Sequence, residues 1–319
     1  MASELNLHSR RENANQSIAH RPEHTRSQNG HYLLLRWNDL PSWQQDNEFI
    51  LTGYRPVSGS FRKSMSSLQH VHNEVVNIYS HLLGAVLFAI LPIYAYARAR
   101  NHHAAIQIGD TIGFATFFFG VILCFSLSAS FHIMSNHSEK VAAYWNQFDY
   151  LGIVILIWGS TVPSIYYGFY CDPNLQNLYW AVVSVLAVVC TIATLSPKFR
   201  HPTLRIYRTA MYASLGLSTV VFITHGLIIH GWEIQNHRMS LTYMLITAML
   251  NFLGAVVYAA RIPERWYQLR YDICGCSHQI FHFIAVFAGL IYMFGLLSAF
   301  CFIHSQAHLC SKAEVHSYN

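Results

Sequence analysis

Seven long runs of apolar residues constrain this chain more than any other feature. Each run holds about 20 mostly apolar residues, the length that an α-helix needs to cross the hydrocarbon core of a bilayer. The predicted spans cover residues 75–97, 108–133, 143–170, 178–195, 207–230, 240–260 and 280–303. Charged residues make up only 11% of the chain, against about 25% in soluble domains. The sequence therefore predicts an all-α fold, a seven-helix bundle that is integral to a membrane.

The Lys and Arg residues near the ends of the spans predict how the bundle is oriented. Eleven of them fall on the side of the N-terminus, and four fall on the opposite side. Because positively charged residues are retained in the cytosol, we expect a cytosolic N-terminus. An odd number of spans then places the C-terminus on the extracytosolic side. The first 30 residues contain no apolar core, so no signal peptide is expected.

The same pattern divides the chain into three parts. Residues 1–74 are polar and are expected to form a cytosolic, partly disordered region, residues 75–305 the seven-helix membrane domain, and residues 306–319 an extracytosolic tail. The basic residues form no stripe with interleaved aromatic side chains, so no nucleic-acid partner is expected. The seven cysteines, an odd number without regular spacing, argue against a disulfide framework.

Three groups of polar residues fall at the ends of spans, where ionisable side chains are costly and indicate a functional site. They are, in chain order, Glu74, Asn77 and His81 at the start of span 1; Ser128 and His132 at the end of span 2, with Asp149 early in span 3; and His278 and His282 at the start of span 7. The predicted topology places all three groups at one depth on the cytosolic side. That coincidence did not enter the charge argument, so it supports the topology independently.

The spacing of these residues favours a metal site. His278 and His282 are four residues apart, so both imidazoles project from one face of a helix, and His132 supplies a third nitrogen from span 2. Three histidines with an open fourth position are typical of catalytic zinc, which lowers the pKa of its bound water to about 7. Asp149 is then expected to orient that water or act as general base. Ser128 lies one turn before His132, suited to hold the water or polarise a substrate carbonyl.

A simpler interpretation competes with each of these assignments. A His-x-x-x-His pair in a chain with 20 histidines is weak evidence of a metal by itself. The shared depth of His132 and Asp149 is what makes the metal site the preferred interpretation. Glu74, Asn77 and His81 are expected to have structural roles or to support the ligands, because the helix start suits an acid and an Asn bonds well between helices.

These motifs resemble those of the progestin and adipoQ receptor family, which is related to hemolysin III, and its fungal zinc-homeostasis branch is the most similar. The motifs are E-x-x-N-x-x-x-H, S-x-x-x-H with a downstream Asp, and H-x-x-x-H, and the segment within residues 40–56 that ends in Gly-Tyr-Arg-Pro is also similar. The resemblance covers residues from about 40 to 305. It implies zinc bound by His132, His278 and His282, with Asp149 and Ser128 close by, and the inverted topology that the charges predict.

The resemblance also implies a function. The adiponectin receptors of this family resemble the alkaline ceramidases in their metal motif, so we expect a zinc-dependent lipid amide hydrolase that acts on a ceramide-like substrate and affects lipid and zinc homeostasis. The alternative is a membrane receptor whose structural zinc ties spans 2 and 7 together and which signals through its cytosolic N-terminal region, with an extracytosolic ligand that the sequence does not identify. A transporter is disfavoured, since the sequence shows neither internal repeats nor broken helices at the midplane. The expected location is the plasma membrane or the endoplasmic reticulum.

Overall fold

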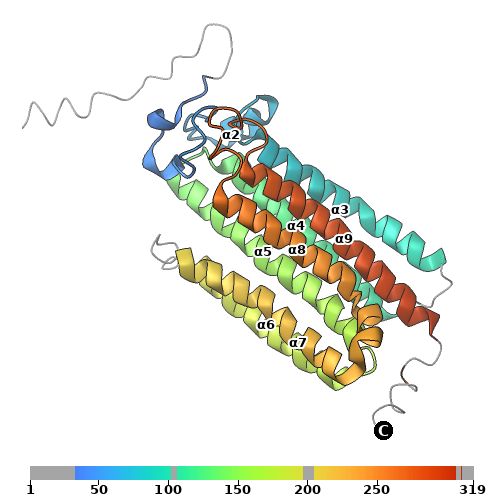
Figure 1. Cartoon of the computed structure of the whole chain (residues 1–319). Coiled ribbons are helices and arrows are strands. Elements are labelled where there is room, and N and C mark those ends of the chain that lie inside the picture. Colours follow the sequence, from blue (N-terminus) through green and yellow to red (C-terminus); the bar gives the residue numbers. More distant parts are fainter. Residues whose placement is uncertain (1–32, 102–105, 197–204, 307–309, 311–319) are drawn as a thin grey trace, which may run out of the picture. The chain divides into compact units, whose positions relative to one another are not determined.

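Seven long helices dominate the structure, a computed structural model that describes residues 33–101, 106–196, 205–306 and residue 310. Every helix within the described ranges belongs to the unit formed by residues 34–319, and Figure 1 shows how the long helices run alongside one another. The long helices are α3 (Val75–Asn101), α4 (Ile108–Met134), α5 (Glu139–Gly168), α6 (Pro173–Leu195), α7 (Arg205–Met239), α8 (Leu241–Ala260) and α9 (Ser277–Ser305). Each is long and apolar enough to cross a membrane, and the described residues form no β-strand beyond one isolated bridge. The all-α, seven-helix prediction is confirmed.

The predicted spans agree with the helices except at the ends. The largest difference is in α7, which continues from the predicted end at residue 230 to Met239. Gly231 interrupts this helix with a non-helical backbone, φ 73° and ψ 167°. Only glycine adopts this region without steric cost, so the chain bends there and resumes a helix. The apolar pattern ends at this bend, and no local sequence signal predicts the further helical segment that follows it.

Helices α4 and α5 pack unusually closely, and small residues make this possible. A Cβ atom added at Gly152 would lie 2.9 Å from the Cα atom of Cys124, and one added at Gly159 would lie 2.5 Å from the carbonyl oxygen of Thr116. Small residues at helix contacts let two backbones approach in a membrane, where the hydrophobic effect does not drive helix association. The contact fixes how α5 is placed against α4, which matters for Asp149 below.

An aromatic core joins α3, α4 and α9. Phe88 of α3, Phe117 and Phe125 of α4, and Phe300 of α9 are at most 1% exposed, and Tyr292 of α9 packs among them. The rings of Phe88 and Phe125 meet edge to face, with their centroids 5.8 Å apart. Edge-to-face contacts of this kind are favourable beyond the area that they bury. The core therefore holds together the three helices that carry the predicted metal ligands and their neighbours.

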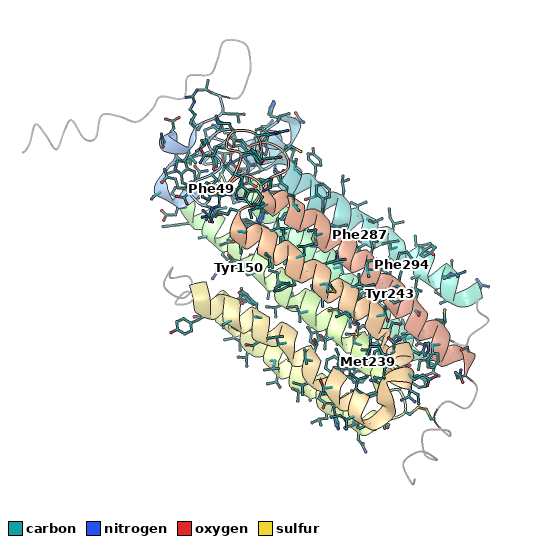
Figure 2. All side chains as sticks on the ribbon, viewed as in Figure 1. Phe49, Tyr150, Met239, Tyr243, Phe287 and Phe294 are labelled. Atoms are coloured by element: carbon teal, nitrogen blue, oxygen red, sulfur yellow. A yellow bond between two sulfur atoms is a disulfide. The ribbon has the colours of Figure 1, made fainter. Side chains whose placement is uncertain are left out.

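The outer faces of the spans are apolar and exposed, as a lipid-facing surface requires. On α9, Phe287 is 53% and Phe294 is 43% exposed, and Figure 2 shows both side chains along this helix. Helix α8 packs along α9, and it meets α7 at the turn where Figure 2 labels Met239 and Tyr243. Exposed large hydrophobic side chains are normal for a bundle whose solvent is lipid.

Residues 34–74 lie at one end of the bundle, the end that contains His132, His278 and His282. They form short elements: η1 (Trp37–Asp39), η2 (Ser42–Gln44), α2 (Phe61–Ser66) and η3 (Ser67–Gln69). The amide of Asn47 donates to Glu264 (3.1 Å), and the hydroxyl of Thr52 donates to Asp272 (2.7 Å), so this segment is bonded to the connection between α8 and α9. Residues 1–32, for which partial disorder was predicted, lie outside the described residues.

The opposite end of the bundle holds a disulfide between Cys171 and Cys310, with 5.3 Å between their Cα atoms. The expectation that the cysteines form no disulfide framework therefore needs correction: one bond is present. The two residues are 139 positions apart, and no spacing rule for cysteine identifies a pair at that separation. The bond joins the turn before α6 to the chain just beyond α9. The other residues of the predicted C-terminal tail, apart from Gln306, lie outside the described residues.

Candidate metal centre

Three imidazoles meet where α4 ends and α9 begins. His278 and His282 project from the same face of α9, with 3.1 Å between their Nε2 atoms, and the Nε2 atom of His132 on α4 lies 3.2 Å from that of His278. One nitrogen of each ring falls within a single group of ligating atoms that span no more than 4.8 Å. His132 and His282 are almost completely buried. The structure thus brings together the three residues that the sequence predicted as ligands.

The outward nitrogens of two rings are held by acceptors. The Nδ1 atom of His132 lies 2.7 Å from Oε2 of Glu74, and the Nδ1 atom of His282 lies 3.1 Å from the carbonyl oxygen of Asn77. A carboxylate and a carbonyl only accept, so each Nδ1 atom donates, and the neutral ring then carries a free lone pair on Nε2. Ser80 adds a hydroxyl 3.0 Å from Nδ1 of His282. Such outer contacts commonly orient histidine ligands toward a metal.

The geometry of the cluster fits a tetrahedral cation. Two nitrogens bonded to one zinc ion at about 2.0–2.1 Å lie about 3.3 Å apart, close to the 3.1 and 3.2 Å that separate the neighbouring Nε2 atoms here. The Nε2 atoms of His132 and His282 belong to one group of potential ligating atoms, and a cation bound among them would replace the repulsion of their lone pairs by attraction. The donor set therefore fits a metal with three nitrogen ligands.

Glu74 is the residue that connects this cluster to the start of α3. Besides His132, its carboxylate accepts a hydrogen bond from the side-chain amide of Asn77 (2.7 Å). Burial alone would raise the pKa of Glu74, but its electrostatic interaction and hydrogen bond with His132, the hydrogen bond of Asn77 and the charge of Arg55 outweigh it and hold the pKa below its usual range. Glu74 is therefore ionised and suited to orient His132. The sequence suggested a supporting role, without naming the partner.

His81, one turn after Asn77, is near the cluster but is not among its converging nitrogens. Its ring stacks on that of His282, with centroids 3.6 Å apart and planes within 2°. Among the described residues neither ring nitrogen of His81 has a hydrogen-bond partner. His81 therefore packs behind a ligand and limits how His282 can rotate.

Asp149 and Ser128 lie beside the cluster. Ser128 is buried one turn before His132, and it hydrogen-bonds the half-buried Asp149 on α5, whose carboxylate also interacts electrostatically with His132. The close approach of Gly152 to α4 places Asp149, one turn earlier on α5, against this part of α4. Asp149 is not one of the converging ligand atoms, so its carboxylate neighbours the cluster through Ser128 and His132 without belonging to it.

Arg55 is a buried neighbour of the cluster that the sequence motifs did not assign to the site. It is only 4% exposed, and its guanidinium donates to the carbonyl oxygens of His132 (2.6 Å) and Ile133 (3.1 Å) and to the hydroxyls of Ser67 (2.8 Å) and Ser135 (2.9 Å). These carbonyls belong to the last turn of α4, where carbonyl groups have no hydrogen-bond donor within the helix. Burial lowers the pKa of Arg55 to about 10, so it stays charged at neutral pH. The Gly-Tyr-Arg-Pro similarity was the only available signal.

Comparison with known proteins supplies the family. The model of the family described as "Haemolysin-III related" matches residues 69–308 of this chain. The chain belongs to the haemolysin III-related family. The family predicted from the three motifs is thus confirmed, and this haemolysin III-related chain is an integral, multi-pass membrane protein.

Several curated relatives carry receptor names. The chain is 40% identical to the adiponectin receptor protein of Drosophila melanogaster over 83% of its own length, and 38% identical to the progestin and adipoQ receptor-like protein 1 of Caenorhabditis elegans over 85%. It spans 59% and 62% of those two relatives. It is also 36% identical to the ADIPOR-like receptor IZH2 of Saccharomyces cerevisiae, with 85% of each chain covered. The matched range of the family model contains all three ligands as well as Glu74, Ser128 and Asp149.

Proposed function

We propose that this protein is a zinc-dependent hydrolase of lipid amides, with a ceramide-like substrate. The observation that carries the proposal is the convergence of three Nε2 atoms beside a carboxylate that is not itself a ligand. Three imidazoles suit zinc, which binds nitrogen ligands and in catalytic sites keeps one position open. When bound, the ion supplies a Lewis acid that polarises a carbonyl group and acidifies a water molecule.

Residues of the chain would supply the base and would orient the groups around the ion. Asp149 is the candidate general base, because its carboxylate is beside His132 and free of the ligand set. Ser128 orients that carboxylate through its hydrogen bond. Glu74 holds His132, and the carbonyl of Asn77 holds His282, so that both rings present the same nitrogen. A positioned acid or base contributes about 10²–10⁴ in rate.

The depth of the site supports a lipid substrate. His132 lies in the last turn of α4, and His278 and His282 lie in the first two turns of α9, so the ligands are near the end of two spans. The ends of membrane spans are expected near the level where the headgroup region of a bilayer meets its acyl chains. An amide that joins a polar head to an acyl chain lies at the same level, whereas a soluble substrate would have to leave water to reach it.

Product release tests the proposal directly. Purified protein in lipid vesicles that contain ceramide is expected to release sphingoid base, detected by mass spectrometry, and a chelator is expected to stop the release until zinc is restored. The same measurement on protein with His282→Ala is the control for a contaminating hydrolase. No release from zinc-loaded wild-type protein would refute the hydrolase.

A receptor with a structural metal is the second candidate, and the contacts of Arg55 favour it. This side chain bonds the segment before α2 to the backbone of His132, so occupancy of the metal centre is mechanically connected to the surface that the segment forms. Several relatives are named as receptors. If the metal is structural, a chelator should change how readily a protease cleaves residues 34–74, and no lipid hydrolysis should be detected with or without the chelator. Unchanged protease sensitivity would contradict this proposal.

The proposed orientation places the metal centre on the cytosolic side. Eleven of fifteen Lys and Arg residues near span ends support it, and so does the disulfide at the opposite end, since such bonds persist in oxidising compartments. Cys274, an exposed free cysteine in the connection before α9, provides the test. A membrane-impermeant maleimide is expected to label it only after cells are permeabilised. Labelling of Cys274 in intact cells would reverse the orientation.

A further inference from the structure

The connection between α8 and α9 contains six consecutive exposed residues, Arg265–Arg270. Three of them have large apolar or aromatic side chains: Trp266 is 66%, Tyr267 is 55% and Leu269 is 62% exposed. An arginine stands at each end of the segment, and it contains no acidic residue. Exposed aromatic residues next to arginines are unusual on a surface that meets only water, and are common where a protein meets the polar layer of a membrane.

Contacts on both sides fix the segment at the level where α9 starts. Just before it, the buried carboxylate of Glu264 accepts hydrogen bonds from the backbone amide of Ser277 (2.7 Å) and from the hydroxyl of the same residue. Just after it, the side-chain amide of Gln279 donates to the carbonyl oxygen of Ile273 (2.9 Å). Ser277 and Gln279 form the first turn of a membrane-spanning helix. The segment is therefore held at the end of a membrane-spanning helix.

The arginines of this segment have no carboxylate partner among the described residues. The guanidinium of Arg265 lies over the ring of Phe49, 5.7 Å from its centroid, and that of Arg270 lies over Tyr271 at 5.9 Å. The neighbouring acids are engaged elsewhere: Glu264 with Ser277, and Asp272 with the backbone of Leu51 and the hydroxyl of Thr52. Two positive charges are thus available to an anion outside the protein.

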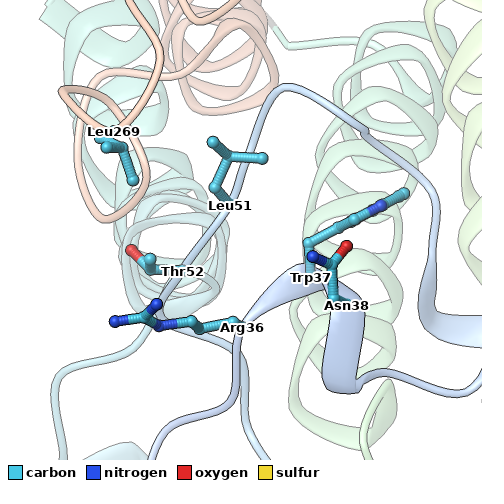
Figure 3. A pocket seen from close by; sticks show the side chains of 6 residues that line it. All are labelled: Arg36, Trp37, Asn38, Leu51, Thr52 and Leu269. Carbon is cyan, nitrogen blue, oxygen red and sulfur yellow. The ribbon is translucent and has the colours of Figure 1, made fainter.

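A pocket opens next to the segment. It has a volume of about 350 Å³, and Figure 3 shows the six side chains that line it: Arg36, Trp37, Asn38, Leu51, Thr52 and Leu269. Leu269 belongs to the exposed segment, so the pocket and the segment share a wall. The lining combines a guanidinium and an amide with apolar surface. This combination suits a charged headgroup that is attached to a less polar glycerol backbone.

We propose that Arg265–Arg270 is an interfacial anchor that binds anionic phospholipids. Trp266, Tyr267 and Leu269 enter the headgroup layer, Arg265 and Arg270 bind lipid phosphates, and the pocket beside Leu269 receives a headgroup. Arginine binds phosphate through a planar pair of donors. Each basic residue next to an anionic membrane surface strengthens binding about fivefold. The anchor is distinct from the metal centre and does not depend on the proposed hydrolase.

Lipid retention by the full-length protein tests the anchor. Protein purified from bilayers that contain equal amounts of phosphatidylserine and phosphatidylcholine is analysed by native mass spectrometry, which counts the lipids that remain bound. The wild type is expected to retain phosphatidylserine preferentially. Arg265→Gln with Arg270→Gln should weaken that preference about 25-fold, and Arg36→Gln should weaken it less. The matched control is Arg62→Gln with Lys63→Gln, which removes two exposed charges from α2 at the same end of the bundle.

Three results would overturn the anchor. They are equal retention of the two lipids by the wild type, an undiminished preference in the double arginine variant, and an equal loss in the α2 control, which would indicate a general charge effect. A second measurement is independent of lipid counting. Brominated phosphatidylserine should quench part of the tryptophan fluorescence, and Trp266→Phe should reduce that quenching. Metal content, expected to be unchanged in each variant, shows that the bundle is intact.

Discussion

Both ends of the bundle contain hydrogen-bonded pairs of a histidine and a carboxylate, but the pairs differ in what they do. At the metal end, Glu74 lies 2.7 Å from His132; at the disulfide end, Asp172 lies 2.8 Å from His230 and Asp110 lies 2.9 Å from His304. Distance and partner type do not separate these pairs. The difference lies in the second nitrogen of each histidine ring. In His132 the second nitrogen, Nε2, lies near the nitrogens of further histidines. The second nitrogens of His230 and His304 belong to no such cluster in the described chain.

The pairs at the disulfide end act as ties between helices. Asp110 in the first turn of α4 is 1% exposed, and it accepts hydrogen bonds from the hydroxyl of Tyr167 on α5 (2.9 Å) and from His304 on α9. Buried carboxylates are stable only when they are paired and hydrogen-bonded. Asp110 is paired with His304 and hydrogen-bonded by Tyr167. A histidine bonded to a carboxylate is therefore structural here. Convergence of free lone pairs, and not the presence of a His–acid pair, identifies a metal centre.

Removing two ligands gives the largest expected effect. His278→Ala with His282→Ala should abolish bound zinc, because one imidazole remains where three are needed. Metal analysis of the purified protein is expected to fall from about one zinc ion per chain to none. The matched control, His230→Gln with His304→Gln, changes two histidines at the disulfide end, keeps an amide donor for Asp172 and Asp110, and should leave the zinc content unchanged. Full occupancy in the first variant would disprove the site.

Asp149→Ala is expected to have the next largest effect, on rate. If Asp149 is the base, hydrolysis at saturating zinc should fall by about 10²–10⁴, while the three histidines retain the metal. Ser128→Ala should lower the rate less, since it only orients the carboxylate. Zinc must be measured on the same sample, because loss of metal would imitate loss of the base. An unchanged rate would remove Asp149 from the mechanism.

The two His–acid pairs can be compared directly by neutralising one acid at each end. Glu74→Gln removes the acceptor that orients His132 and should weaken zinc binding about 10–100-fold, the usual cost of losing such an outer contact. Asp172→Asn makes the same change at the disulfide end and should not alter zinc affinity. Competition with a chromophoric chelator measures both. Equal affinities for wild type and Glu74→Gln would show that Glu74 does not support the ligand.

Acid should destabilise the metal end slightly. His72 is 1% exposed, and burial, followed by the charge of Arg55, lowers its pKa to about 4. An unfolded chain binds this proton near pH 6.5, so stability is full above that pH and is lost as pH falls toward 4. Between pH 7 and pH 5.5 the loss is about 1 kcal/mol. His72→Asn should reduce this dependence in thermal unfolding of the detergent-solubilised protein, and His70→Asn is the control. An identical pH profile in His72→Asn would assign the effect to other groups.

The helices and their membrane character follow from the sequence, because hydrophobic length is a local property. A run of about 20 apolar residues must satisfy its backbone hydrogen bonds internally in lipid, and a helix does this regardless of its neighbours. The pairing of His278 with His282 is local in the same way, since helix geometry places residues four apart on one face. Even the grouping of the ligand-bearing ends was accessible, because it required only the count and direction of the spans.

Only the tertiary structure decided which nitrogens point where. Glu74 was visible as an acid at the start of a span, but its bond to His132 depends on how α3 lies against α4, and that packing is set by contacts such as those of Phe88 and Phe125. The bond between Cys171 and Cys310 and the capping of α4 by Arg55 join positions 139 and 77 residues apart. No local pattern records such pairs, because they form when whole helices pack, and the sum of many weak contacts, not the spacing of a few residues, sets that packing.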